Sequence, residues 1–267
     1  MKLYIAKILL LGFLGVFNNS IDITGNFLDN SIEEQYINKH LPSKAEKILF
    51  KKKNYFTEQL DGKGNKEIIV PFKEKGIDKA IFLLVINYDD TSSTAYKVKG
   101  EGSNIERLEF HDINGDGKKD IVLGTRTGMD IHELTVYSHG KNKMHKEFSY
   151  SYSKLDILED SKDSSVVMAF WKRGEQNCFK IELVRWNGKE LIEAKDLNRK
   201  YFAKVVEYYK NLCSLQRDNA WAWYYLADAQ IKAGFKEDAA VSIANGVALN
   251  KESPSKQQFE QLKSSIK

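Results

Sequence analysis

Hydrophobic and polar positions alternate through most of residues 41–195, and this pattern predicts β-strands. Residues 105–110, 133–138 and 146–150 follow the alternation, while the apolar run at 79–88 predicts a buried strand. Turn-forming residues separate these segments, and one of the turns is Asn187-Gly188, a pair that favours a tight hairpin. We therefore expect antiparallel strands joined by hairpins.

The same order of segments recurs three times along this part of the chain. A short polar loop precedes an apolar strand at residues 59–70, 112–124 and 156–168, so the repeats lie about 45–55 residues apart. Further alternating segments follow each of these pairs. The period is typical of β-repeat architectures and predicts a β-repeat domain over residues 41–195.

From residue 196 onward, apolar side chains recur at helical spacing. Residues 197–215 predict one helix, with Tyr201, Phe202, Val205 and Tyr209 among its apolar positions. Residues 219–250 predict two more helices joined by a turn at Gly234, and a polar helix follows Ser253-Pro254. Residues 196–267 are therefore expected to form a helical module.

The N-terminus has the pattern of an export signal. Lys2 and Lys7 supply a cationic start, and residues 8–17 form an apolar core of secretory-signal length. This segment is shorter than the roughly 20 apolar residues of a membrane-spanning helix. We interpret residues 1–20 as a signal peptide or N-terminal membrane anchor, with a buried element of the fold as the alternative. Residues 21–40 are interpreted as a polar linker containing a short helix at 31–37.

Composition limits the classes of function. The chain has 267 residues, 42% of them hydrophobic, so it can bury a sizeable core. A net charge of only +4, without a clustered basic face, makes nucleic acid an unexpected partner. Residues 51–53 are consecutive lysines that we interpret as a solvated strand edge, with an anionic envelope polymer as the alternative partner. Cys178 and Cys213 are expected to be unpaired buried thiols, and a disulfide between them is left open.

The loop at residues 112–120 has the spacing of a calcium loop. Oxygen-bearing side chains stand at its first, third, fifth and ninth places, with glycine at the sixth. Hard cations take oxygen ligands, and the main-chain carbonyl of the seventh place adds one more. The alternative is a polar turn that binds no ion. The sequence predicts a Ca²⁺ site formed by Asp112, Asn114, Asp116, the Lys118 carbonyl and Asp120.

This loop is not an EF-hand, because Leu123 occupies the place of the bidentate glutamate and strands flank it on both sides. It resembles the calcium loops of FG-GAP and VCBS-type repeats, which belong to integrin-α-like β-propellers. The resemblance implies an ion that braces a repeat without taking part in chemistry. It also implies a partial or degenerate β-propeller-like domain, so the expected fold is mixed, mainly β with a helical C-terminal module.

The two other loops are degenerate copies of the calcium loop. Gln59, Asp61, Lys63 and Glu67 fall on the ligand places of the first copy. We expect the Lys63 ammonium to replace the charge of a lost cation there. In the third copy, Leu158 and Ser164 occupy ligand places, so we expect no metal.

The helical module resembles a tetratricopeptide repeat. Trp223, Leu226 and Ala227 match the packing places of the first helix, Gly234 the turn, and Ala239, Ile243 and Gly246 those of the second. First helices of that family line a groove for peptides, and the resemblance therefore implies a docking surface for a protein or peptide partner. The alternative is that the aromatic residues pack within the protein. The residues expected to contact the partner are Trp221, Tyr224, Asp228, Ile231 and Lys232.

No catalytic motif accompanies these features. Neither a metal-spaced histidine pair nor a G-x-S-x-G, P-loop or dinucleotide fingerprint is present. We therefore do not expect an enzyme. The sequence predicts an exported, extracytoplasmic, calcium-braced binding or scaffold protein that mediates protein–protein or envelope contacts, touching a membrane only through its N-terminal segment. The alternative is a cell-envelope hydrolase or carbohydrate-binding accessory protein.

Overall fold

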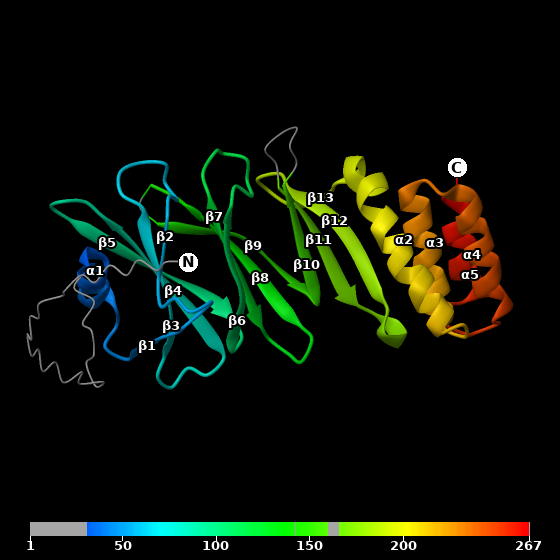
Figure 1. Ribbon diagram of the computed structural model, residues 1–267, viewed down its shortest axis with the longest axis horizontal. Helices are drawn as coiled ribbons and strands as arrows, with labels where there is room; N and C mark the ends of the chain where they lie inside the picture. The colour runs from blue at the N-terminus through cyan, green and yellow to red at the C-terminus, as the bar shows by residue number, and fades with distance from the viewer. Residues whose placement is uncertain (1–30, 142, 160–165, 267) are drawn as a thin grey trace, which may run out of the picture.

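The computed structural model describes residues 31–141, 143–159 and 166–266, and it is mixed in class. Antiparallel sheets build the N-terminal part and helices the C-terminal part, as expected (Figure 1). In the described residues the sheets do not close into a barrel or a propeller. The predicted signal segment, residues 1–20, and the first half of the predicted linker, residues 21–30, lie outside the described residues.

The first sheet has five strands. Its main strands run in the order β3, β4, β5, and the short strands β1 and β2 both pair with β3. The strands are β1 (Ala45–Lys47), β2 (Phe56–Glu58), β3 (Glu67–Glu74), β4 (Ala80–Tyr88) and β5 (Ser93–Glu101).

The second and third sheets repeat this plan with four strands each, in sequence order. The second sheet contains β6 (Asn104–His111), β7 (Asp120–Arg126), β8 (His132–His139) and β9 (Met144–Tyr152). The third contains β10 (Lys154–Glu159), β11 (Val166–Arg173), β12 (Phe179–Trp186) and β13 (Leu191–Glu193). In each sheet the buried strand that follows the polar loop, β3, β7 or β11, lies inside the sheet.

The sheets are stacked as layers between helices (Figure 1). The helix α1 (Ile32–His40) covers the outer face of the first sheet, where Ile37 joins a buried cluster with Val70 and Phe82. Other apolar clusters join the first sheet to the second and the second to the third. Helices thus cover both end faces of the stack. Part of the segment expected as a linker is therefore a helix packed on the sheet.

The helical module packs on the third sheet. The 3₁₀ turns η1 (Glu175–Asn177) and η2 (Lys195–Leu197) flank β12 and β13. A large apolar cluster joins the third sheet to α2 and α3, with Phe202, Val206 and Tyr209 buried within it. The helices are α2 (Asn198–Leu215), α3 (Ala220–Ala233), α4 (Lys236–Ala248) and α5 (Lys256–Ser264).

Local sequence signals explain where several elements end. Ser31 caps α1 through its side chain, which accepts a hydrogen bond from the Glu34 N–H. Gly234 ends α3 in the left-handed conformation, φ 83°. Cys178 and Cys213 are buried free thiols, as expected. Within the described residues, no helix is both long and apolar enough to cross a bilayer.

Candidate functional site

The predicted calcium loop connects β6 to β7 and is held by hydrogen bonds from its own backbone. Asp112 Oδ1 accepts hydrogen bonds from the N–H groups of Gly115 (2.8 Å) and Asp116 (3.1 Å), and Oδ2 accepts one from Gly117 (2.8 Å). Asp120, at the start of β7, accepts one from Ile113 (2.9 Å). The carboxylates thus stand inside a tightly wound turn.

The loop before β3 repeats this backbone at equivalent positions. The Lys63 N–H donates to Asp61 Oδ1 at 2.7 Å, as the Asp116 N–H donates to Asn114 Oδ1 at 3.0 Å. Likewise the Leu60 N–H donates to Glu67 Oε2 at 2.6 Å, which matches the bond from Ile113 to Asp120.

Glycines of the two loops also agree in conformation. Gly62 and Gly115 have φ values of 74° and 75°, and Gly64 and Gly117 have 63° and 82°, in the left-handed region that glycine adopts readily. The first two predicted copies of the loop therefore have the same turn conformation. Of the third copy, Leu158 lies in β10, whereas Ser164 lies outside the described residues.

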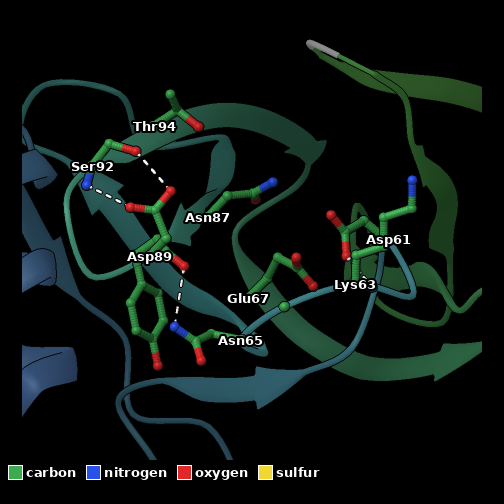
Figure 2. Close-up of a pocket in the computed structure, with 10 residues that line it drawn as sticks. Asp61, Lys63, Asn65, Glu67, Asn87, Asp89, Ser92 and Thr94 are labelled. Carbon is green, nitrogen blue, oxygen red and sulfur yellow. Dashed lines mark hydrogen bonds between the residues drawn. The ribbon is translucent and has the colours of Figure 1, made fainter.

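A polar hollow of about 250 Å³ lies beside the first loop (Figure 2). Asp61 and Glu67 reach it from the loop, and Asn87 and Asp89 come from the end of β4 and the turn that follows. Both carboxylate oxygens of Asp89 accept hydrogen bonds: Oδ1 accepts them from Thr91 and Ser92, and Oδ2 accepts one from the Ser92 hydroxyl. Sequence reasoning missed this hollow, because its two sides are about 20–30 residues apart in sequence and only strand pairing brings them together.

Lys63 does not take the role expected for it. Among the described residues its ammonium forms no ion pair with Asp61 or Glu67, and Figure 2 shows it pointing away from Glu67. An ion pair between Lys119 and Glu58, 3.1 Å apart, joins the loop at residues 112–120 to the end of β2 in the first sheet.

Burial dominates the electrostatics of both loops. Asp120 and Glu67 are each only 2% exposed. Burial raises the pKa of Asp120 to about 7, against the hydrogen bonds from Ile113 and Asn114 that lower it. Burial likewise raises the pKa of Glu67. His139, beside Asn87 at 2.8 Å, has a pKa lowered by burial. The first two loops therefore each bury one carboxylate at their base.

The donor set of residues 112–120 fits a hard cation. It supplies three carboxylates, one amide oxygen and the Lys118 carbonyl, and a carboxylate oxygen that accepts one hydrogen bond keeps a further lone pair. Within the part of the chain that the structure describes, no group of three or more His, Cys, Asp or Glu side chains is arranged to hold a metal. The residues can therefore serve as ligands only if the carboxylates turn from the backbone toward an ion.

The five residues expected to contact a partner all lie on α3 and are half-buried. Trp221 stacks on Tyr225 with ring centroids 5.6 Å apart, and Tyr224 packs edge-on against Phe259 of α5. Asp228 and Lys232 form an ion pair at 2.7 Å. The aromatic rings thus pack partly within the helical module, as the alternative interpretation expects, and remain partly exposed to solvent.

One histidine of the described chain lies against a serine hydroxyl. His40 Nε2 lies 2.8 Å from Ser93 Oγ, and Lys39 donates to the same hydroxyl at 3.0 Å. Burial lowers the pKa of His40, and no carboxylate among the described residues bonds to its ring. Sequence reasoning missed this pair, which joins α1 to β5 across 53 residues.

No protein-family model matches the chain, and no curated protein matches its sequence.

Proposed function

We propose that this is an exported binding or scaffold protein whose β-repeat domain is braced by one Ca²⁺ and whose helical module docks a protein or peptide. Asp112, Asn114, Asp116, Asp120 and the Lys118 carbonyl would hold the ion. The bound ion would supply positive charge that neutralises the loop carboxylates and tightens the turn between β6 and β7. It would have no catalytic part.

One observation carries the calcium part of the proposal. Asp112 and Asp116 stand in a turn shaped by Gly115 and Gly117, and the first unit repeats that turn without the full donor set. A turn that persists after its ligands have changed supports a repeat architecture in which only one copy keeps the metal. FG-GAP and VCBS-type repeats, which the loop resembles, use calcium in this bracing role.

The docking part of the proposal is supported by α3. Trp221 and Tyr224 are held in place by rings on either side, so they would lose little conformational entropy on binding. Large, rigid aromatics are preferred contact residues in protein interfaces. Asp228, Ile231 and Lys232 continue the same face of the helix toward its C-terminus.

A second candidate function is that of a cell-envelope hydrolase or carbohydrate-binding accessory. The hollow beside the first loop favours it, because Asp61, Glu67 and Tyr88 line one concave surface. It ranks second because the Leu60 N–H already holds Glu67 at the loop base.

Calcium is expected to raise the melting temperature of the protein by about 5–10 °C. An ion at roughly 100 times its Kd stabilises the folded state by about 2.7 kcal/mol, and each kcal/mol shifts the melting of a domain of this size by about 2–4 °C. The Asp116→Ala variant should lose this rise, because the carboxylate ligand at the fifth place is gone. Differential scanning calorimetry with and without Ca²⁺ measures both.

Asp61→Ala provides the matched control. Asp61 accepts a backbone hydrogen bond in the equivalent turn of the first loop and lies outside the calcium donor set. This variant should keep the full calcium response. An unchanged melting temperature of the parent protein in saturating Ca²⁺ would rule out the metal site.

The docking surface is tested by capture from cell-envelope extracts. The parent protein should retain a partner that the Trp221→Ala/Tyr224→Ala double variant retains at least about tenfold less, because truncating two hot-spot aromatics costs 1.4 kcal/mol or more of binding free energy. Val241→Ala, at an exposed apolar position on α4, serves as the control and should bind like the parent. Equal capture by all three proteins would exclude this surface.

A further inference from the structure

One edge of β12, in the third sheet, lacks a neighbouring strand along half its length in the described chain. The edge strand β13 pairs with β12 only from Val184 to Trp186, and the chain then leaves the sheet at Ala194 to enter η2 and α2. The other half of β12, from Phe179 to Leu183, therefore has β11 on one side and none of the described strands on the other.

The backbone of Ile181 points toward this open side. Ile181 lies opposite Trp171 in the β11–β12 pairing, and the Trp171 carbonyl accepts a hydrogen bond from the Ser153 N–H at 2.8 Å. Trp171 thus directs its backbone away from β12, so the two residues are a non-hydrogen-bonded pair of the antiparallel ladder. The N–H and C=O of Ile181 consequently face the open edge.

The next outward-facing residues of β12, Phe179 and Leu183, have hydrogen-bond partners at the same edge. The hydroxyl of Tyr209 accepts a hydrogen bond from the Phe179 N–H (2.9 Å) and donates one to the Phe179 carbonyl (2.5 Å). The Leu183 carbonyl accepts one from the Ala194 N–H at 2.8 Å. Across the described chain, no such partner reaches the outward N–H or C=O of Ile181.

These two groups face a hollow although the residue itself is buried. Ile181 is only 3% exposed, and a hollow of about 410 Å³ runs along the edge of β12 beside it. Buried backbone donors and acceptors are nearly always paired, so a vacant pair in a hollow indicates a missing partner. Asn198 Oδ1, on the wall of the same hollow, is a buried acceptor that also lacks a hydrogen bond within the described residues. The walls include Tyr150, Glu182, Leu191, Asn198, Phe202 and Lys232.

The charges around the hollow favour a neutral occupant. Lys180 is paired with Glu182 at 2.8 Å and Lys232 with Asp228 at 2.7 Å. Glu193 is paired with Lys195 at 3.6 Å. The charged side chains therefore balance one another, and the unmet groups are one amide donor and two carbonyl-type acceptors, which the backbone of an extended peptide complements.

We propose that the open edge of β12 binds an extended, uncharged peptide segment of another protein, which adds to the third sheet in the place of the missing half of β13. The peptide backbone pairs with the N–H and C=O of Ile181, and a further peptide N–H donates to Asn198 Oδ1. This site is distinct from the Trp221–Tyr224 surface and shares only Lys232 with it, so either can fail without the other.

Amide hydrogen exchange by NMR on the full chain tests the proposal, with acetyl-Thr-Val-Thr-Val-Thr-amide as the probe peptide. Without peptide, the Ile181 amide should exchange at least about tenfold faster than those of Lys180 and Glu182, which face β11. Peptide at millimolar concentration should slow the Ile181 amide to their rate. The same peptide N-methylated at both valines should have no effect, because it cannot pair with a strand edge.

Two variants complete the test. Asn198→Phe fills the hollow from its rim and leaves β12 intact, and it should abolish the protection by the peptide. Ile181→Pro removes the outward N–H at an edge position where proline is tolerated, and it should do the same if it folds. The proposal is overturned if the Ile181 amide is already protected in the free protein, if its protection grows with protein concentration, which would indicate a second copy, or if the peptide leaves it unchanged.

Discussion

Replacing Tyr209 by alanine is expected to lower the free energy of unfolding by about 3–5 kcal/mol or more, the range typical of losing a buried aromatic ring. Tyr209 is 1% exposed, and its ring stacks on Tyr225 of α3 with centroids 5.9 Å apart. Its hydroxyl closes the edge of β12 at Phe179. One side chain thus joins α2, α3 and the third sheet. Chemical denaturation followed by circular dichroism measures the loss.

Tyr209→Phe separates the two contributions. It keeps the ring and removes only the hydroxyl, which leaves the Phe179 N–H and carbonyl without their partner. The expected cost is about 1–3 kcal/mol for unsatisfied buried groups. If Tyr209→Phe and the parent were equally stable, the hydroxyl would not be needed to close this edge, and the cost of Tyr209→Ala would come from packing alone.

Replacing Gly102 by alanine is expected to cost about 2–5 kcal/mol. Gly102 lies between β5 and β6, where the chain crosses from the first sheet to the second, and its φ is 110°. A Cβ there would lie 2.2 Å from the Arg126 carbonyl oxygen of β7, so the backbone would have to shift. The left-handed conformation costs about 1–2 kcal/mol and overpacking about 1–3 kcal/mol. Denaturant titration of the purified variant gives the change.

Gly76→Ala is the matched control for this substitution. Gly76 has a similar φ of 91° in the turn between β3 and β4, but no atom lies within 4 Å of the position its Cβ would take. This variant should show only the conformational cost, about 1–2 kcal/mol. Equal losses from the two glycine variants would mean that the Arg126 carbonyl does not restrict the junction between the sheets.

Local patterns in the sequence were sufficient for most elements. The alternation at 105–110 became β6 and the apolar run at 79–88 became β4, because strand formation depends on side chains facing alternate sides of a buried layer. Helices α2, α3 and α4 follow the predicted spacing, and Gly234 ends α3 as expected. The prediction of a polar linker was incomplete, because Ile37 finds an apolar surface on the first sheet that the sequence around it does not reveal.

The candidate sites also divide into those that the local sequence predicts and those that it does not. The tight turn at residues 112–120 could be predicted because its residues lie within nine positions, and the shared turn at Gly62 and Gly115 follows from the same short spacing. Three other features could not be predicted: the hollow beside Glu67 and Asn87, the pair of His40 with Ser93, and the open edge at Ile181. Each joins segments that are distant in the sequence.

By itself, then, the sequence determined strands, helices, turns and the oxygen-bearing side chains of the loop at residues 112–120, because these depend on residues a few positions apart. Only the tertiary structure decided that the three sheets, as far as the chain is described, stack as layers between α1 and α2 without closing into a ring, and that β13 ends before it covers Ile181. Those outcomes depend on which apolar faces meet and where the chain must leave a sheet, and no local periodicity encodes either.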